Sequence, residues 1–160
     1  MQRITPFFWF DDKAEEAANY YVSVFKNARI EKVVRYNKAA ASATGRPEDS
    51  AMTVAFTLDG QKYVAMNGGP HLKINEAVSF VINCESQDEV DHYWARLTEG
   101  GDPAAQRCGW LKDKFGVSWQ IVPTVLPELL QGAKAGNVMQ ALMQMSKLDI
   151  AALKRASEQT

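Results

Sequence analysis

Alternating apolar and polar positions in the first half of the chain predict a strand, a helix and three further strands. The run Ile4–Phe10 is dense in apolar and aromatic side chains, which is typical of a strand buried on both faces. Asp12 is then expected to cap a helix, with Glu15 completing a capping box. The segment 37–50 is poor in large apolar residues and is predicted to be a mobile surface loop. The further strands are expected over 30–36, 52–58 and 62–66.

The same order of elements begins again in the second half. Residues 77–83 predict a second buried strand, and Ser86 with Glu89 forms a second capping box before a helix. Gly100 and Gly101 are expected to end that helix. Short strands through Trp110 and Leu111 and a strand over 117–122 follow, and two tail helices are expected near 128–130 and 138–145.

The two halves align without gaps through their first strand and helix. Pro6–Phe10 overlays Ser79–Asn83, and the apolar helix positions continue at the same offset, with Tyr21 over Trp94. Each half is therefore expected to form a curved sheet with one helix on its outer face. Two such halves would enclose a cleft between their inner faces, where small-molecule sites usually form.

Composition and charge narrow the possible partners. Apolar residues make up 46% of the 160 residues and charged residues 23%, with a formal net charge of -1, so the chain has a globular composition and no broad basic surface for nucleic acid. No stretch has the length of a membrane span, and no export signal is recognised at the start of the sequence. A cytoplasmic location with no membrane partner is therefore expected, and Cys84 and Cys108 are interpreted as buried structural thiols.

Two segments carry a resemblance to a known family. The run 75–85 (NEAVSFVINCE) and the run 108–123 (CGWLKDKFGVSWQIVP) resemble the PhnB-like, demethylubiquinone-methyltransferase-like subgroup of the vicinal oxygen chelate superfamily. That superfamily includes glyoxalase I, bleomycin-resistance proteins and extradiol dioxygenases. The tail over 138–153 is similar to the C-terminal extension of the subgroup. The second half departs from the pattern between Gly101 and Gly116, where its middle strands must be abbreviated.

The resemblance implies an α+β fold with two βαβββ-type modules forming a curved mixed sheet around a cleft, followed by C-terminal helices. Residues 1–160 are expected to form a single domain, and a homodimer is the expected assembly. Within that domain the first module is expected over 1–70, the second over 75–123 and the helical extension over 124–160. The methyltransferase name finds no support in the residues, because the chain lacks the glycine-rich turn of a parallel sheet that usually holds a methyl donor.

Catalytic members of the superfamily hold a divalent metal on inward-facing side chains of four strands. Carried over to this chain, the ligand positions fall on Pro6, Val64, Ser79 and Gln120. Proline and valine cannot ligate a metal, a serine hydroxyl is a poor ligand, and only Gln120 could contribute an oxygen. One weak ligand does not hold a metal ion, so we expect no metal and no other cofactor. His71 and His92 are interpreted as solvated residues, in a loop and on a helix respectively.

If those ligand positions face inward, alternation along the strands places further side chains in the cleft. The candidate ligand-binding residues are Phe8, Met66, Ser79, Val81, Ser118 and Gln120. The preferred hypothesis is a metal-free protein that binds a small-molecule ligand. One alternative is an enzyme of lyase, isomerase or dioxygenase type that uses Gln120, Ser79 and His71, and a second is a structural dimeric interaction module.

Overall fold

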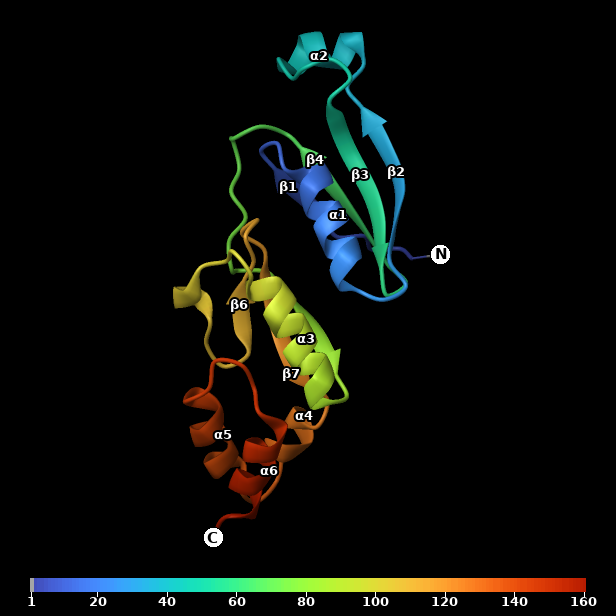
Figure 1. The fold of residues 1–160 in the computed structure, drawn as a ribbon. Helices are drawn as coiled ribbons and strands as arrows, with labels where there is room; N and C mark the ends of the chain where they lie inside the picture. Colours follow the sequence, from blue (N-terminus) through green and yellow to red (C-terminus); the bar gives the residue numbers. More distant parts are fainter. Residues whose placement is uncertain (1) are drawn as a thin grey trace. The chain divides into compact units, whose positions relative to one another are not determined.

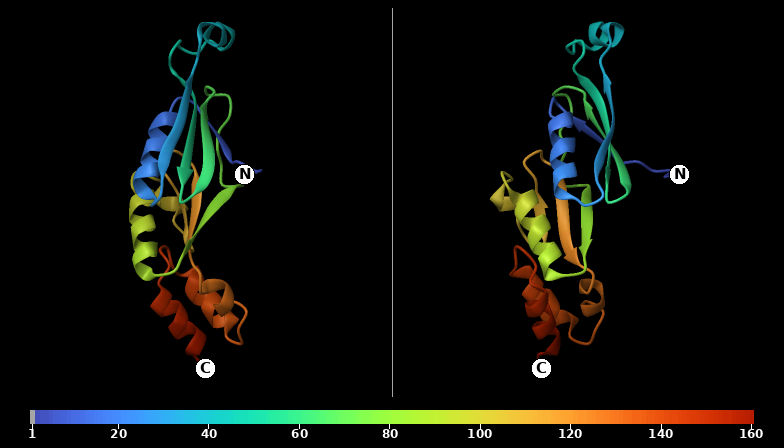
Figure 2. Two further views of the ribbon diagram at one scale, coloured as in Figure 1. Left: turned by 90° about the vertical axis from the view of Figure 1, so that its right-hand side faces the viewer. Right: turned by 45° about the vertical axis from the view of Figure 1, so that its right-hand side comes forward.

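The computed structural model describes residues 2–160 and divides the chain into two compact units, one up to Ile74 and one over Asn75–Thr160. Each unit is a mixed sheet with one long helix on one face (Figures 1 and 2). The α+β fold class expected from the sequence is therefore confirmed. No helix within residues 2–160 is long and apolar enough to cross a bilayer.

The first unit contains a four-stranded sheet in the order β1-β4-β3-β2, with β1 parallel to β4 and the other pairs antiparallel. Helix α1 covers one face, where aromatic rings of Tyr21 and Phe56 stack with centroids 6.2 Å apart. The strands and helices are β1 (Phe7–Phe10), α1 (Ala14–Val24), β2 (Arg29–Arg35), α2 (Lys38–Thr44), β3 (Ala51–Leu58) and β4 (Gln61–Asn67).

Three local predictions in this unit are wrong. The strand expected over Ile4–Phe10 begins only at Phe7, and Phe7 is 57% exposed, so the strand is not buried on both faces. Asp12 does not cap α1. Lys13 occupies the N-cap position without a side-chain cap, and the Ala14 N–H instead donates to the buried Asn67 Oδ1 at 2.7 Å. Within the segment predicted to be a loop, α2 forms because Asn37 Oδ1 accepts from the Ala40 N–H, and Gly45 ends the helix in left-handed geometry. Helix α2 has no buried residue, so its sequence carries no apolar stripe from which a helix could be predicted.

The second unit contains a three-stranded sheet in the order β5-β7-β6, with β5 parallel to β7. Ser86 caps α3 as predicted, since its Oγ accepts from the Glu89 N–H at 3.2 Å. The abbreviation of the middle strands is also confirmed, because β6 has only three residues and a 3-10 turn precedes it. The elements are β5 (Ser79–Cys84), α3 (Gln87–Thr98), η1 (Pro103–Ala105), β6 (Trp110–Lys112) and β7 (Ser118–Pro123).

One face of this second sheet is left uncovered by α3. Val81 at the middle of β5 is 49% exposed, so β5 is buried on one face only and the prediction of a strand buried on both faces is wrong. The alternation along β7 is clear, with Trp119 and Ile121 buried on the helix side and Gln120 half-buried on the other. Each sheet contains one parallel pair, which agrees with the expected mixed sheet.

The internal repeat is present in the helices but shifts by one residue in the strands. Ala14 and Gln87, which overlay in the gap-free alignment, are the first residues of α1 and α3. The overlaid strand residues nevertheless face opposite ways. Phe7 is 57% exposed, whereas Phe80 packs against Trp119 on the helix side of its sheet. A one-residue difference in the strand-to-helix connection accounts for the shift, because side chains alternate with a period of two.

The C-terminal residues form a small helical cluster of their own. It contains α4 (Leu126–Leu129), α5 (Ala135–Met143) and α6 (Ile150–Glu158), packed around Val138, Leu148 and Leu153, which are fully buried. The apolar stripe of α5 packs against α4 and α6, and Met139 and Met143 remain 42% and 62% exposed.

This cluster is joined to the sheet through a tight turn at Cys108 and Gly109. Both residues have positive φ, 54° and 86°, and the flanking Arg107 and Trp110 pair across the turn, which is the pattern of a type I′ hairpin turn. The Cys108 N–H donates to the Met145 carbonyl at 2.8 Å, and the Gly109 N–H donates to the Ser146 carbonyl at 2.9 Å. Cys108 therefore lies in a turn and not in a strand, and it is half-buried.

Candidate functional site

The uncovered face of the second sheet collects the candidate residues from the second half of the chain. Ser79 on β5 lies beside Ser118 on β7, and Val81 lies beside Gln120. The antiparallel strand β6 adds Trp110 beside Gln120 and Lys112 beside Ser118 on the same face. We call this surface the open face of the second sheet. Its polar and apolar groups alternate along short, well-paired strands that fix their positions.

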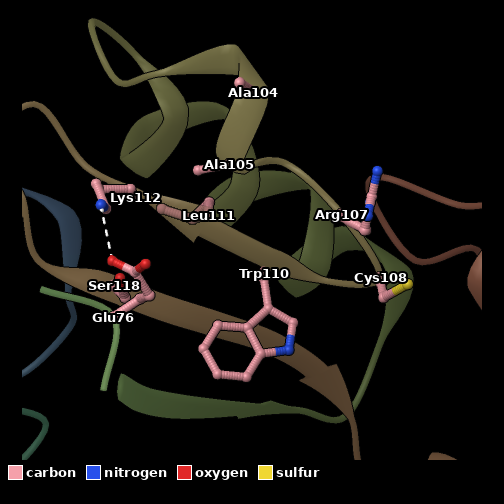
Figure 3. A pocket seen from close by; sticks show the side chains of 9 residues that line it. All are labelled: Glu76, Ala104, Ala105, Arg107, Cys108, Trp110, Leu111, Lys112 and Ser118. Carbon is pink, nitrogen blue, oxygen red and sulfur yellow. Dashed lines mark hydrogen bonds and ion pairs between the residues drawn. The ribbon is translucent and has the colours of Figure 1, made fainter. Parts of the chain in front are cut away.

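A hollow of about 530 Å³ opens at the β6 side of this face. Figure 3 shows the Trp110 ring on the same side of the strands as Glu76 and Ser118, with Arg107 at the end of β6. Cavities of ~300–1,000 Å³ are the usual size for small-molecule sites. The lining combines an aromatic ring, a hydroxyl and charged groups, so it suits a small ligand that has both a flat apolar part and polar substituents.

Ser118 is the most enclosed polar group of the hollow. The residue is only 2% exposed and lines the cavity, yet its hydroxyl has no hydrogen-bond partner within residues 2–160. Among the described residues Arg46 Nε is the only buried polar side-chain atom without a partner, so the Ser118 oxygen keeps its contact with the hollow. The Ser118 hydroxyl is therefore placed to hydrogen-bond a bound molecule.

The other polar groups of the face are engaged with each other. Gln120 Nε2 donates to Ser79 Oγ at 3.0 Å, which leaves the Ser79 hydroxyl proton and the Gln120 carbonyl oxygen for a ligand. Lys112 Nζ lies 3.1 Å from Glu76 Oε2 at the rim of the hollow, as drawn in Figure 3. A hydrogen bond to its own backbone and the Lys112 ammonium lower the pKa of Glu76, so this carboxylate is ionised at neutral pH.

The hairpin that carries these residues is anchored by a buried carboxylate. Asp113 lies at the tip of the β6–β7 hairpin, yet it is only 3% exposed and accepts from three donors. Its Oδ1 accepts from the Phe115 N–H at 2.8 Å and the Val117 N–H at 3.1 Å, and its Oδ2 accepts from Trp119 Nε1 at 2.8 Å. This network fixes the register of β6 against β7, and with it the positions of Trp110 and Ser118.

The candidates from the first half divide between the two faces of their sheet. Phe8 does not lie on the uncovered face. It is 7% exposed, lies beside Ala65 and stacks on Tyr63 with centroids 6.0 Å apart on the α1 side. Met66, beside Trp9, lies on the uncovered face as expected. In the gap-free alignment Phe8 overlays Val81 and was expected to face the same way. The connection from strand to helix is one residue longer in the first unit, so Phe8 faces the opposite side of its sheet.

A divalent metal does not fit the side chains that these faces present. On the first sheet the uncovered face carries Phe7, Trp9 and Val64, and on the second the nearest donors are the neutral oxygens of Ser79 and Gln120. Within the described part of the chain no three His, Cys, Asp or Glu side chains come together in a group that could hold an ion. Transition metals in proteins rest on imidazole, carboxylate or thiolate ligands, so this donor set does not hold one.

The remaining titratable candidates lie elsewhere. His92 is exposed on α3 beside Tyr93, as expected, and His71 is exposed in the segment that follows β4. Cys84 is fully buried, and burial raises the pKa of its thiol to about 12, so it is unreactive at neutral pH. The sequence analysis missed Trp110, Glu76 and Arg107 as lining residues. The alternation of side chains along β6 could have identified Trp110, because a residue paired with Gln120 points to the same face of the sheet.

Comparison with known proteins agrees with this architecture. The family model described as 3-demethylubiquinone-9 3-methyltransferase matches residues 2–122. A putative 3-demethylubiquinone-9 3-methyltransferase, PhnB protein, from Bacillus cereus is 32% identical over 77% of this chain and 100% of its own, with a TM-score of 0.65. No curated protein matches the chain.

More distant solved structures share the fold. Protein PA1353 from Pseudomonas aeruginosa is 20% identical over 77% of this chain and 98% of its own, with a TM-score of 0.59. The fosfomycin resistance protein FosX from Mesorhizobium loti is 19% identical over 82% of this chain and 100% of its own, with a TM-score of 0.55. With its two sheet-and-helix units and its family match over most of its length, the chain belongs to the PhnB-like 3-demethylubiquinone-9 3-methyltransferase family of the vicinal oxygen chelate superfamily.

Proposed function

We propose that this protein binds a small organic molecule without the help of a metal ion, through the open face of its second sheet. The observation that carries the proposal is Ser118, a residue only 2% exposed whose hydroxyl opens into the hollow and lacks a protein partner within residues 2–160. A ligand that accepts or donates at this oxygen forms a hydrogen bond in a largely enclosed position. Trp110 supplies the flat apolar surface beside it.

The proposal includes the arrangement of the modules. We expect the two units to pair as modules of one vicinal oxygen chelate domain, 1–70 with 75–123, and the chain to form a homodimer in the cytoplasm. Ser79, Val81 and Gln120 extend the binding surface along the second sheet, and Met66 stays a candidate on the first. Phe8 is no longer part of the proposed site, because its ring is buried against Tyr63.

The family name by itself does not make this chain a methyltransferase. Both sheets are mixed, and the strand-to-helix connections, Asp11–Lys13 and Glu85–Ser86, contain no glycine. A methyl donor of nucleoside type usually sits on a glycine-rich turn of that kind, where the backbone approaches the ligand closely. Sequestration or sensing of a small ligand therefore fits the residues better than methyl transfer.

The test is a thermal-shift screen of a metabolite library, run with a divalent-metal mixture and with a chelator, followed by tryptophan fluorescence titration of each hit. We expect a hit that needs no metal and that quenches the wild type but not Trp110→Phe, while Trp94→Phe on α3 behaves as the wild type. Ser118→Ala should weaken binding by roughly 3- to 10-fold, the value of one hydrogen bond. A tightly held stoichiometric metal in the purified protein would refute the proposal. So would Ser118→Ala and Trp110→Phe variants that both bind the hit with the affinity of the wild type.

A further inference from the structure

A second hollow, of about 510 Å³, lies in the first unit at the N-terminal end of α1. Its wall is formed by the start of that helix, the end of β2 and the segment that follows α2. The polar side chains that line it are Asp12, Glu15, Arg35, Arg46 and Ser50, and we call it the arginine cavity. Asn67, also in the wall, is engaged by the Ala14 N–H and the Ala51 carbonyl.

The unused hydrogen-bonding capacity of Arg46 is the main evidence that this cavity binds a ligand. Its side chain is only 21% exposed, and its Nε is buried without a hydrogen-bond partner within residues 2–160. Its Nη2 donates to the Asp11 carbonyl at 3.2 Å, and its Nη1 lies 3.8 Å from Asp11 Oδ1. A guanidinium offers five donors in a planar fork, and charge-assisted hydrogen bonds normally measure about 2.7–2.9 Å. Most of this binding capacity is therefore unused.

Arg35, which also lines the cavity, has donors that its present contacts use only weakly. Its Nη1 donates to the Asp49 carbonyl at 3.1 Å, while its Nη2 lies 3.4 Å from Glu15 Oε2. Both members of this pair are about half exposed, 50% and 43%, and such ion pairs contribute only ~0–1 kcal/mol. A ligand carboxylate can replace Glu15 at little cost. The positive end of the α1 dipole favours the same charge at this place.

Asp12 supplies the opposite charge. Its carboxylate forms no hydrogen bond or ion pair with any side chain of residues 2–160, although it lines the cavity. Ser50 Oγ donates to the Pro47 carbonyl and keeps lone pairs that accept from a cationic donor. Both residues can therefore accept from an ammonium group bound in the cavity.

The charges of the lining decide the class of ligand. Two guanidinium groups and two carboxylates leave the cavity with no net charge. A simple anion is repelled by Asp12 and Glu15, and a simple cation is repelled by Arg35 and Arg46. We propose that the arginine cavity binds a small zwitterion of the α-amino acid type, with the carboxylate on Arg46 and Arg35 and the ammonium on Asp12. Pro47 and Ala51 in the wall favour a short apolar side chain.

The proposal is tested with three probes that differ only in charge: L-alanine, propionate and ethylamine, titrated at constant ionic strength into the full-length protein. Amide chemical shifts in NMR spectra report the site through Ser50 and Ala51. We expect saturable shifts with L-alanine and at least about 10-fold weaker binding of propionate and of ethylamine, since each forms only one of the two charged contacts.

Variants complete the test. Arg46→Gln and Asp12→Asn should each weaken L-alanine binding by about 10-fold, whereas Glu48→Gln, in the same segment but outside the lining, should leave it unchanged. Asp12 is exposed, so its variant folds even if Arg46→Gln does not. Propionate binding as tight as L-alanine binding, or an unchanged affinity in Asp12→Asn, overturns the zwitterion site. The site on the second sheet is unaffected by either result, because its residues belong to the other unit.

Discussion

Replacing Asp113 by asparagine should destabilise the second unit by about 2–3 kcal/mol. Asparagine keeps the size of the side chain and one acceptor oxygen, so the Phe115 and Val117 amides can still be satisfied. The second position becomes an NH₂ group that faces the Trp119 indole N–H, where the carboxylate now accepts at 2.8 Å. The substitution removes one charge-assisted hydrogen bond, worth about 1.5–3 kcal/mol, and leaves a buried donor facing another donor.

The measurement is a double-mutant cycle with Trp119→Phe, followed by urea denaturation. Trp119 is 1% exposed, so Trp119→Phe alone also costs stability through the volume it removes. The cycle subtracts that cost and isolates the coupling between the two residues, which we expect to be at least about 1.5 kcal/mol. A coupling below about 0.5 kcal/mol, or an Asp113→Asn variant as stable as the wild type, would show that the carboxylate does not anchor the hairpin.

Four further predictions follow from the second unit. Cys108→Val should cost about 1–2 kcal/mol in urea denaturation, because a β-branched residue is poor at a φ of 54°, while Cys108→Asn should stay within about 0.5 kcal/mol of the wild type. Leu153→Ala should cost roughly 2–5 kcal/mol and expose the amides of α5 and α6 to hydrogen exchange, which the surface control Met143→Ala should not do. In a Cys108→Ser background, ultraviolet absorbance should detect no Cys84 thiolate below about pH 10, because burial raises the pKa of this thiol to about 12. The folded protein then holds the Cys84 proton more tightly than the unfolded chain does, so the free energy of unfolding should fall as the pH rises above about 9. Met143→Lys should leave folding intact and, if α5 contributes to the expected dimer, should give a monomer in analytical ultracentrifugation; a dimer with unchanged affinity would exclude α5 from the interface.

Most elements of the fold could be predicted because local patterns specify them. The alternation from Met52 to Leu58, the Asp59–Gly60 turn and the Ser86 cap each depend on residues close in sequence, and all are present in the structure. The failures depend on distant partners. Asn67 caps α1 from across the sheet, and no residue near Asp12 signals that contact. Helix α2 was missed because an exposed helix carries no apolar stripe.

For the candidate site, the sequence could identify the strands but not always the direction of their side chains. Ser79, Val81, Ser118 and Gln120 share one face because the β5–β7 register matches the predicted alternation. Phe8 faces the other way because one additional residue before α1 changes the phase of β1 relative to its repeat. A strand with apolar residues at every position gives no indication of its phase, so only packing against Tyr63 determines it.

The sequence by itself determined that the chain repeats a strand-helix-strand unit, that it belongs with the PhnB-like proteins, and that the strands offer few metal ligands, because periodicity, capping residues and side-chain chemistry are local properties. Tertiary structure alone decided that Asp113 is a buried anchor, that the Ser118 hydroxyl lacks a partner, and that Arg46 and Asp12 line one cavity. Burial and pairing arise from residues that meet only when the chain folds, so no local pattern contains them.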